Sequence, residues 1–233
     1  PPTTGTQVYN AIARTGTGAD ATVTGVGFAP DAVIASARTS GYAKNFMDRL
    51  RGRPVLAATS LAAEVTPSAS EDLVAWGMDG VSVGGQASTP INAAVSTVDH
   101  FFKRAPGFFD VVCYKSSGSV MSVTHSLGMA PELMIIKDRA ATNGWAVYHK
   151  GVGNTKYLAL NATTTPATLS SAWNNTSPTN TVFTVGTAGI TGSAGLHDYV
   201  AYLFATLPGI SKVGSYTGNG SSQTINCGFS AGA

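Results

Sequence analysis

The stretch VGFAPDAVIASAR (residues 26–38) decides the fold, because LGMAPELMIIKDR (residues 127–139) repeats its pattern later in the chain. Each stretch reads Gly, a large apolar residue, Ala-Pro, an acid, an apolar run and a closing Arg. Three pairs of anchors share one offset of 101 positions: Gly27 and Gly128, Pro30 and Pro131, and Arg38 and Arg139. A shared offset predicts an internal duplication, and such repeats define the architecture of a chain.

A third copy of the pattern begins near the end, where GSYTGNGSSQTINCGF (residues 214–229) repeats the opening of the unit. We therefore predict three segments: a first repeat at 1–106, a second at 107–208, and the opening strands of a truncated third at 209–233. The chain starts at Pro1 and stops early in the third copy, which indicates a piece of a longer protein. Each complete unit has about 100 residues, enough for its own core. We expect compact modules laid end to end.

Charge and composition exclude several classes of partner. Fourteen basic and twelve acidic side chains give a net charge of +2, too little for an electrostatic nucleic-acid or membrane partner. The sequence has no apolar run long enough to span a membrane. Cys113 and Cys227 occupy different positions of the repeat, which is poor evidence for a disulfide, and we expect two small buried thiols.

Short alternating segments separated by Gly, Pro, Ser and Thr predict an all-β fold. In the second repeat we expect one strand at 109–115, with 119–125 as its hairpin partner across the SSG turn. The apolar run at 133–138 predicts a strand buried on both sides. Further strands are expected at residues 145–150, 156–161, 181–186 and 198–205. Helical turns are expected only near Glu64 and Leu169. The pattern favours two tandem β-sandwich, jelly-roll-like domains plus the start of a third repeat.

The repeated Gly and Pro have a structural explanation. Gly27 and Gly128 are expected to need a backbone conformation that a side chain opposes. The prolines that follow would fix the entry to the apolar strand. Arg38 and Arg139 would close that strand by pairing with backbone carbonyls or an acid.

Residues with catalytic chemistry are scattered. The four histidines, at 100, 125, 149 and 197, show no metal-binding spacing, and His100 and His197 are interpreted as polar residues at a strand edge. The sequence contains no Gly-x-Ser-x-Gly elbow, and its Gly-rich segments lie between strands, where they predict hairpin turns. The carboxylates do not form a pair. We therefore expect no catalytic residues, no metal and no cofactor: the chain is not predicted to be an enzyme.

Two groups of side chains are candidates for ligand binding. Arg49, Arg51 and Arg53 alternate, so on a strand they would share a face and could hold an anionic glycan or phosphate; the competing interpretation is a charged strand edge that discourages aggregation. Trp173 lies among small polar residues and is predicted to be exposed, so it could stack on a sugar ring beside Asn174 and Asn175. Trp145 precedes an alternating strand and is expected to fill the core.

Several longer segments resemble a family. They are YTGNGSSQTINCGF, GFAPDAVIASAR, GWAVYHKGVGNTKYLALN, AWNNTSPTNTVFTVG and DYVAYLFATLPGISKVGSYTGNG. Together they resemble an uncharacterised tandem repeat domain of bacteriophages, many of them marine, that often follows a concanavalin-like lectin domain in tail or tail-fibre proteins. The first repeat departs from this form after Arg38, where TSGYAKNFMDRLRGRP and EDLVAWGMDGVSVGG match a variant of the same repeat.

The resemblance implies a virion-associated, fibre-like protein and supplies no catalytic residues. Our leading hypothesis is a structural and host-recognition part of a phage tail fibre or similar virion appendage. Its repeats would act as spacers, its partners would be other tail proteins, and its loops would contact a host surface glycan. By analogy with fibres, a homotrimer is favoured. The alternatives are a carbohydrate-binding module of a cell-wall or capsule-degrading enzyme, and a capsid decoration or bacterial surface protein.

Overall fold

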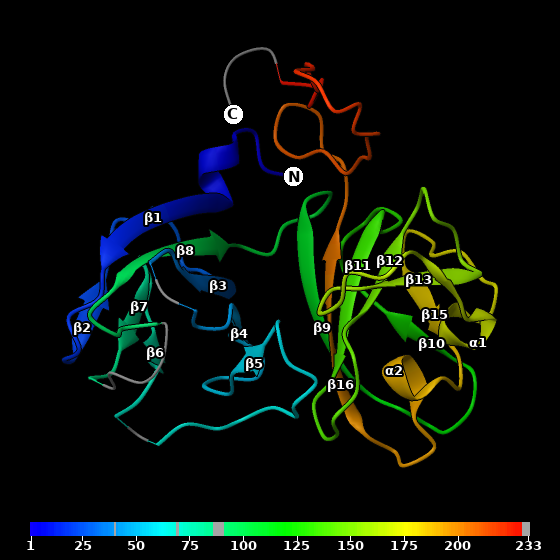
Figure 1. The fold of residues 1–233 in the computed structure, drawn as a ribbon, viewed down its shortest axis with the longest axis horizontal. Helices are drawn as coiled ribbons and strands as arrows, with labels where there is room; N and C mark the ends of the chain where they lie inside the picture. Colours follow the sequence, from blue (N-terminus) through cyan, green and yellow to red (C-terminus); the bar gives the residue numbers. More distant parts are fainter. Residues whose placement is uncertain (40, 69, 86–90, 230–233) are drawn as a thin grey trace.

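The computed structural model describes residues 1–39, 41–68, 70–85 and 91–229, and its regular structure is almost entirely strand (Figure 1). The predicted all-β sandwich class is confirmed. In the first repeat the strands are β1 (Tyr9–Thr15), β2 (Ala21–Val23), β3 (Ala32–Ala37), β4 (Asn45–Asp48), β5 (Leu56–Ala57), β6 (Leu73–Trp76), β7 (Val81–Val83) and β8 (Ser96–Phe102), after a 3-10 turn, η1 (Gly5–Gln7). In the second they are β9 (Phe109–Lys115), β10 (Met121–Thr124), β11 (Leu133–Asp138), β12 (Ala146–His149), β13 (Lys156–Ala159), β14 (Ala167–Thr168), β15 (Val182–Val185) and β16 (Asp198–Phe204), with two short helices, α1 (Ser170–Trp173) and α2 (Gly189–Gly192).

The large sheets of the two repeats share one topology. The large sheet of the first repeat has the order β1-β8-β3-β4-β5, and that of the second has the order β14-β13-β12-β11-β16-β9. Read from β9, the second order matches the first strand for strand, with β14 added at its far edge. The registers match as well: Ala32 lies opposite Phe102 in one sheet, as Leu133 lies opposite Phe204 in the other.

A smaller sheet closes each repeat into a sandwich. Sheet β2-β7-β6 covers the inner face of the first large sheet, and sheet β10-β15 with α1 covers that of the second. Alternate residues of each strand therefore enter an internal core. The buried side chains that define the two internal cores include Val33, Met47, Leu73, Val83 and Phe101 in the first repeat, and Ile136, Tyr148, Trp173, Phe183 and Tyr199 in the second.

The predicted hairpin between β9 and β10 is wrong. Strand β10 pairs with β15 in the small sheet, while β9 pairs along its whole length with β16 in the large sheet. The turn at residues 116–120 therefore carries the chain from one layer of the sandwich to the other. Strands β1 and β2 are related in the same way, since β1 pairs with β8 and β2 with β7. Adjacency in the sequence suggested a hairpin, but burial of both apolar faces favours a crossing between sheets.

The repeated glycines adopt the backbone conformation expected of them. Gly27 has φ +85° and Gly128 has φ +71°, values that L side chains rarely adopt. In the first repeat this turn is also held by Asp79, whose carboxylate accepts the N–H of Gly25 at 3.0 Å and of Gly27 at 2.6 Å. The turn delivers the chain into the central strand β3, which explains why both copies keep its pattern.

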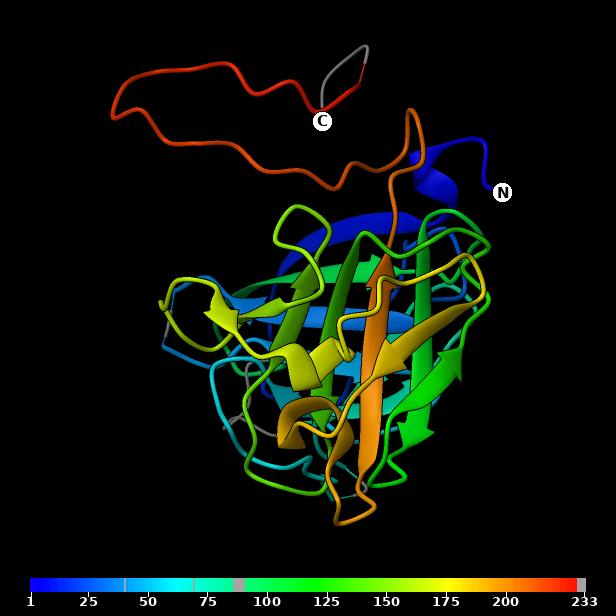
Figure 2. The same cartoon turned by 90° about the vertical axis from the view of Figure 1, so that its right-hand side faces the viewer.

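The two repeats are not independent modules laid end to end, because their large sheets pack face to face. The strands of the two sheets run crosswise, as seen where the β16 sheet lies in front of the first repeat (Figure 2). Between them lies a third core, here called the shared core. Its buried members are Val8, Ala32, Phe46, Leu56 and Ala58 from the first repeat, and Phe108, Phe109, Val111, Ile135, Trp145, Val147, Val200 and Tyr202 from the second. This continuous apolar contact joins both repeats into one body.

Polar contacts reinforce the shared core along one segment of the first repeat, residues 57–64, here called the contact loop. Trp145 Nε1 donates to Ala57 O at 3.1 Å, and the fully buried Lys137 donates through Nζ to Leu61 O at 3.1 Å. Burial lowers the pKa of Lys137, although Asp138 opposes the shift. Because buried donors must find acceptors, these bonds fix the loop against the second repeat.

Glu64 at the end of the contact loop forms the ion pair between the repeats, with Arg139, and a second ion pair within the first repeat, with Arg51. Its carboxylate accepts two bonds from Arg139, at 2.7 and 2.9 Å, and one from Arg51 at 3.0 Å. The prediction that Arg139 closes its strand on an acid is therefore confirmed. Arg51 is fully buried and also bonds Asp48 Oδ2 at 2.6 Å, which itself accepts from the hydroxyl of Tyr202 at 2.9 Å. The helical turn expected near Glu64 does not form.

These ion pairs predict an acid-sensitive contact between the repeats. Burial would raise the pKa of Glu64, but the bonds from Arg139 and Arg51 outweigh it and hold that pKa below its ordinary value. The stabilisation is therefore present above the unfolded pKa of about 4.3 and is lost as the pH falls through the lower folded value. We expect Glu64→Gln to reduce the wild-type loss of Tm between about pH 6 and pH 3. Thermal melts across this range measure it; identical pH profiles would contradict the assignment.

The strands predicted at the start of a third repeat do not form within residues 209–229. In both complete repeats the first strand pairs with the last, and the described chain offers this segment no such partner; a lone strand pair is marginal in water. The segment after the Leu207–Ser211 bridge is instead exposed and irregular. Residues 230–233 lie outside the described part of the chain. Both this segment and Pro1 lie at one end of the molecule (Figures 1 and 2).

Candidate functional site

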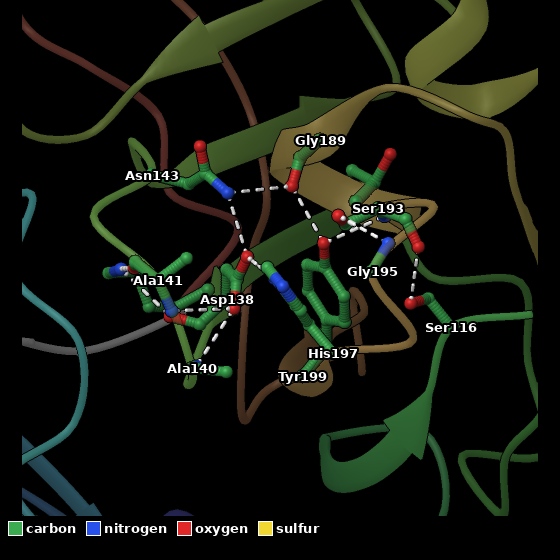
Figure 3. A network of polar contacts seen from close by, with 12 residues as sticks. Ser116, Asp138, Ala140, Ala141, Asn143, Gly189, Ser193, Gly195, His197 and Tyr199 are labelled. Carbon is green, nitrogen blue, oxygen red and sulfur yellow. Dashed lines mark hydrogen bonds and ion pairs between the residues drawn. The ribbon is translucent and has the colours of Figure 1, made fainter. Parts of the chain in front are cut away.

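A network of polar groups lies at the opposite end of the second repeat, where β11 ends and β16 begins (Figure 3). Its centre is Asp138, whose side chain is fully buried. Oδ1 accepts the backbone N–H of Ala140 at 2.8 Å and of Ala141 at 3.1 Å, which folds the loop after β11 around the carboxylate. Oδ2 accepts the side-chain amide of Asn143 at 2.7 Å and lies 2.8 Å from Nδ1 of His197.

The hydrogen bonds keep Asp138 ionised. Burial would raise its pKa, but the bonds from His197, Asn143 and Ala140 outweigh that effect, so the pKa of Asp138 lies below its ordinary value. An ionised Asp138 accepts the N–H of Nδ1 of His197, which leaves Nε2 as the ring nitrogen without this bond; the side chain is 27% exposed. Gly195 packs against this nitrogen so closely that a Cβ there would lie 2.5 Å from it.

Tyr199 ties a second loop to the same network. Its hydroxyl donates to Gly189 O at 2.7 Å, at the start of α2, and accepts the N–H of Ser193 at 2.9 Å. Burial raises the pKa of Tyr199 to about 12, so the phenol stays protonated and keeps donating. Ser116 donates to Ser193 O at 2.7 Å and so attaches the β9–β10 turn. Three loops are therefore fixed around Asp138 and Tyr199.

The surface above this network carries one conformationally unusual residue. Leu196 has φ +56° and is 50% exposed, directly before His197. A bulky side chain in the left-handed region costs free energy and persists only where its surroundings impose it. We name the tip formed by residues 139–144 and 193–197 the distal loops. They could present Leu196 and the His197 imidazole to a partner.

The network lacks the arrangement of a nucleophilic catalyst. No hydroxyl or thiol among the described residues hydrogen-bonds Nε2 of His197, so the Asp138–His197 pair has no nucleophile to activate. Within the same described ranges, no three His, Cys, Asp or Glu side chains come together as metal ligands. What the geometry provides is loop preorganisation and a surface-facing imidazole.

Replacing Asp138 by alanine is expected to lower the free energy of unfolding by about 2–4 kcal/mol, because the part-buried N–H groups of Ala140 and Ala141, the Asn143 amide and His197 all lose a bond to the same buried carboxylate. The matched control is Asp198→Ala, one strand away. Asp198 is 54% exposed and pairs with the 62% exposed Lys115 at 3.7 Å, an ion pair expected to contribute less than about 1 kcal/mol. Urea unfolding measures both; equal losses in the two variants would contradict the assigned role of Asp138.

The sequence indicated a different site, and its central residue is buried. Trp173 is fully buried in the internal core of the second repeat, where Nε1 donates to Lys156 O at 2.8 Å and the ring meets Tyr148 edge-on. The predicted exposure of Trp173 is therefore wrong. Asn174 and Asn175 are exposed, with φ of 51° and 52°, and end α1 in a left-handed turn. The polar residues around Trp173 belong to this turn, whereas α1 directs the indole inward.

The three arginines do not share a strand face, which corrects the second prediction. Strand β4 ends at Asp48, and residues 49–53 form a turn that directs the three side chains differently. Arg51 is buried between the repeats and is therefore not available to a ligand. Arg49 donates to Pro30 O at 2.9 Å and lies 5.4 Å over the Trp76 ring.

Arg53 donates through Nε to Leu73 O at 3.2 Å. Both it and Arg49 therefore support the loops of the first repeat. Trp145 fills the core as expected, although that core is the shared one. Cys113 and Cys227 are free and exposed, so the prediction of buried thiols is wrong.

Sequence reasoning missed the Asp138–His197 pair. Neither residue has a polar counterpart in the first repeat. The matching strand registers make Ala37 the counterpart of Asp138. The signal available was an acid at the end of the apolar strand in one copy only. Its histidine partner follows 59 residues later, and only the pairing of β11 with β16 brings the two together.

Comparisons with known proteins give one match. No curated protein and no solved structure matches the chain. None of the helices in the described ranges is long and apolar enough to cross a membrane. The model of one family, described as a domain of unknown function (DUF7483), matches residues 4–107 and again 96–231. The two matches cover both repeats and nearly the whole chain, and the protein belongs to the DUF7483 family.

Proposed function

We propose that the chain is a structural and host-recognition part of a bacteriophage tail fibre or similar virion appendage. The observation that carries the proposal is the shared core. Two repeats joined by a continuous apolar contact, by the Arg139–Glu64 ion pair and by the hydrogen bonds of Tyr202 to Arg51 and Asp48 form a rigid body rather than two domains on a flexible tether. Rigidity suits a component that positions a contact surface and has no catalytic step.

The position of the chain ends distinguishes the two ends of this rigid body. The N-terminal residue and the segment after β16 lie at one end, and the distal loops lie at the other (Figure 1). A neighbouring part of an appendage would attach at the first end. The distal loops would then point outward, where loops on a rigid scaffold commonly make contacts. This arrangement favours a projecting unit over the linear spacer that the sequence suggested.

The carbohydrate-binding alternative loses the contact that motivated it, because Trp173 is buried. A host glycan, if one is bound, would meet the distal loops instead. A glycan array with the wild-type chain and Leu196→Ala separates these cases. Binding that depends on Leu196 supports recognition by the distal loops, and binding that Leu196→Ala leaves unchanged contradicts it.

The location on a particle is the direct test. Antibodies raised against the chain are applied to purified particles produced by the genome that encodes it, and the labelled particles are imaged by electron microscopy. We expect label on the tail or another external appendage. Label confined to the capsid shell would favour the decoration alternative, and unlabelled particles would refute a virion role.

A further inference from the structure

The first large sheet ends in a strand whose outer edge is open. Lys103 N–H donates to Val8 O at 2.8 Å, and Gly16 N–H donates to Val95 O at 3.0 Å, so the even-numbered residues of β1 face β8. In an antiparallel ladder the intervening residues direct their backbone groups the other way. Tyr9, Ala11, Ala13 and Thr15 therefore present N–H and C=O groups outward, and these groups have no partner among the described residues.

The side chains of β1 do not protect this edge. Natural edge strands are commonly guarded by lysine, proline, a bulge, an inward-pointing charge or a covering loop. The seven residues of β1 include no proline or lysine and pair with β8 without a bulge. Its one charged side chain, Arg14, turns inward but is neutralised by Asp99 at 2.6 Å, and Asn10 also turns inward, where it donates to Gly25 O and Val26 O at 3.2 Å.

The other edges of the large sheets are less suited to pairing. Strands β5 and β14 have only two residues each. Strand β9 is as long as β1, but its edge lies in an open groove of about 440 Å³, between Leu50 on one side and residues 124–126 on the other. It also ends in the exposed Lys115. Among the described edges, β1 is thus the long one without a guard.

We propose that β1 is a docking surface for β1 of a second copy of this chain, paired antiparallel about Ile12 and joining two five-stranded sheets into one. In this register Ala11 lies opposite Ala13 of the second copy, and Tyr9 lies opposite Thr15. Arg14 lies opposite Asn10, so no like charges meet. The outward groups of each strand then satisfy those of the other. The proposal is independent of the proposed function, and its two-fold geometry predicts a dimer where the resemblance favoured a trimer.

The mass of the full chain in solution tests the proposal, using analytical ultracentrifugation over a range of concentrations. We expect a concentration-dependent dimer. Ala13→Pro removes one outward N–H from each copy and keeps the pairing with β8, since that N–H makes no bond to β8. Losing the two hydrogen bonds across the dimer is expected to weaken association about tenfold or more. The matched control is Cys113→Pro, the equivalent position on β9, which should leave the dimer unchanged.

A covalent trap tests the register. With both native cysteines replaced by serine, Ile12→Cys places one thiol of each copy at the two-fold centre, in a non-hydrogen-bonded pair whose Cα atoms lie about 4.5 Å apart. Mild oxidation is expected to yield a disulfide dimer, whereas Val112→Cys, its counterpart on β9, should not. A monomer at all concentrations, or a dimer that Cys113→Pro weakens and Ala13→Pro does not, would overturn the proposal.

Discussion

Replacing Arg51 by alanine is expected to lower the free energy of unfolding by about 3–5 kcal/mol. The reason is the burial of the whole charge cluster: the side chains of Arg51 and Asp48 are both fully buried, and Glu64 is 15% exposed. Without the guanidinium, the buried carboxyl group of Asp48 has only the Tyr202 hydroxyl and the backbone N–H of residue 51 as hydrogen-bond donors. For a chain of this size the loss corresponds to a fall in Tm of roughly 10 °C.

The control is Arg49→Ala, two residues away in the same turn. Arg49 is 33% exposed, and its longer contact to Asp31 measures 4.0 Å. It loses its stacking on Trp76 and two hydrogen bonds, to Pro30 O and Gly77 O, so we expect a cost of about 1–2 kcal/mol. Urea unfolding of both variants measures the two losses in the free energy of unfolding. If Arg51→Ala cost no more than Arg49→Ala, the buried cluster of Arg51, Asp48 and Tyr202 would make no net contribution to stability.

The arginine turn also shows where sequence reasoning ends. Alternation of Arg49, Arg51 and Arg53 predicted a shared strand face, because period two is the signature of a strand. Strand β4 ends at Asp48, directly before the first of the three arginines. Whether their side chains share a face therefore depends on where the strand ends. The residue at which a strand ends depends on tertiary contacts, and a local sequence pattern does not show those contacts. In this case the contact is the bond between Arg51 and the end of the strand itself.

The fold was more predictable than the site because duplication supplied two independent copies of each signal. The apolar run at 133–138 predicted a strand buried on both sides, and β11 has those bounds. The run also contained the first sign of the shared core, since Ile136 enters the internal core while Ile135 enters the shared one. A sequence indicates that a second apolar face exists. It does not indicate that the other repeat covers it.

The network around Asp138 was hidden for the opposite reason: it occurs in one repeat only. A search for repeated patterns detects only what both copies share. Asp138, Asn143 and His197 are not repeated in the first copy, so such a search does not find them. Differences between the copies are then the informative feature. The scaffold repeats, but the buried and fully bonded carboxylate of Asp138 does not, so the loop after β11 has an anchor that Ala37 cannot provide in the first repeat. This asymmetry is why the distal loops of the second repeat are the proposed contact surface.

Replacing Trp145 by alanine is expected to separate the unfolding of the two repeats. The indole is fully buried in the shared core, packs against Phe46 with ring centroids 5.0 Å apart, and donates to Ala57 O in the contact loop. Its removal leaves a cavity and takes one of two donors from Ala57 O, which still accepts the N–H of Ser60 at 3.1 Å; the expected cost is about 3–5 kcal/mol. Because the loss falls between the repeats, each internal core keeps its own packing. Calorimetry of the wild-type chain should show one cooperative transition, and Trp145→Ala should show two.

Trp173→Ala provides the matched control, since it removes the same side chain from an equally buried place in the internal core of the second repeat. The expected cost is again about 3–5 kcal/mol, but it falls on the second repeat itself, so its unfolding temperature drops. The first repeat is still joined to the second through an intact shared core, so it is expected to unfold in the same transition. Two transitions in Trp145→Ala and one lowered transition in Trp173→Ala would identify the shared core as the element that couples the repeats. A single transition in both variants would mean that the ion pairs of Arg51, Glu64 and Arg139 maintain the coupling without the indole.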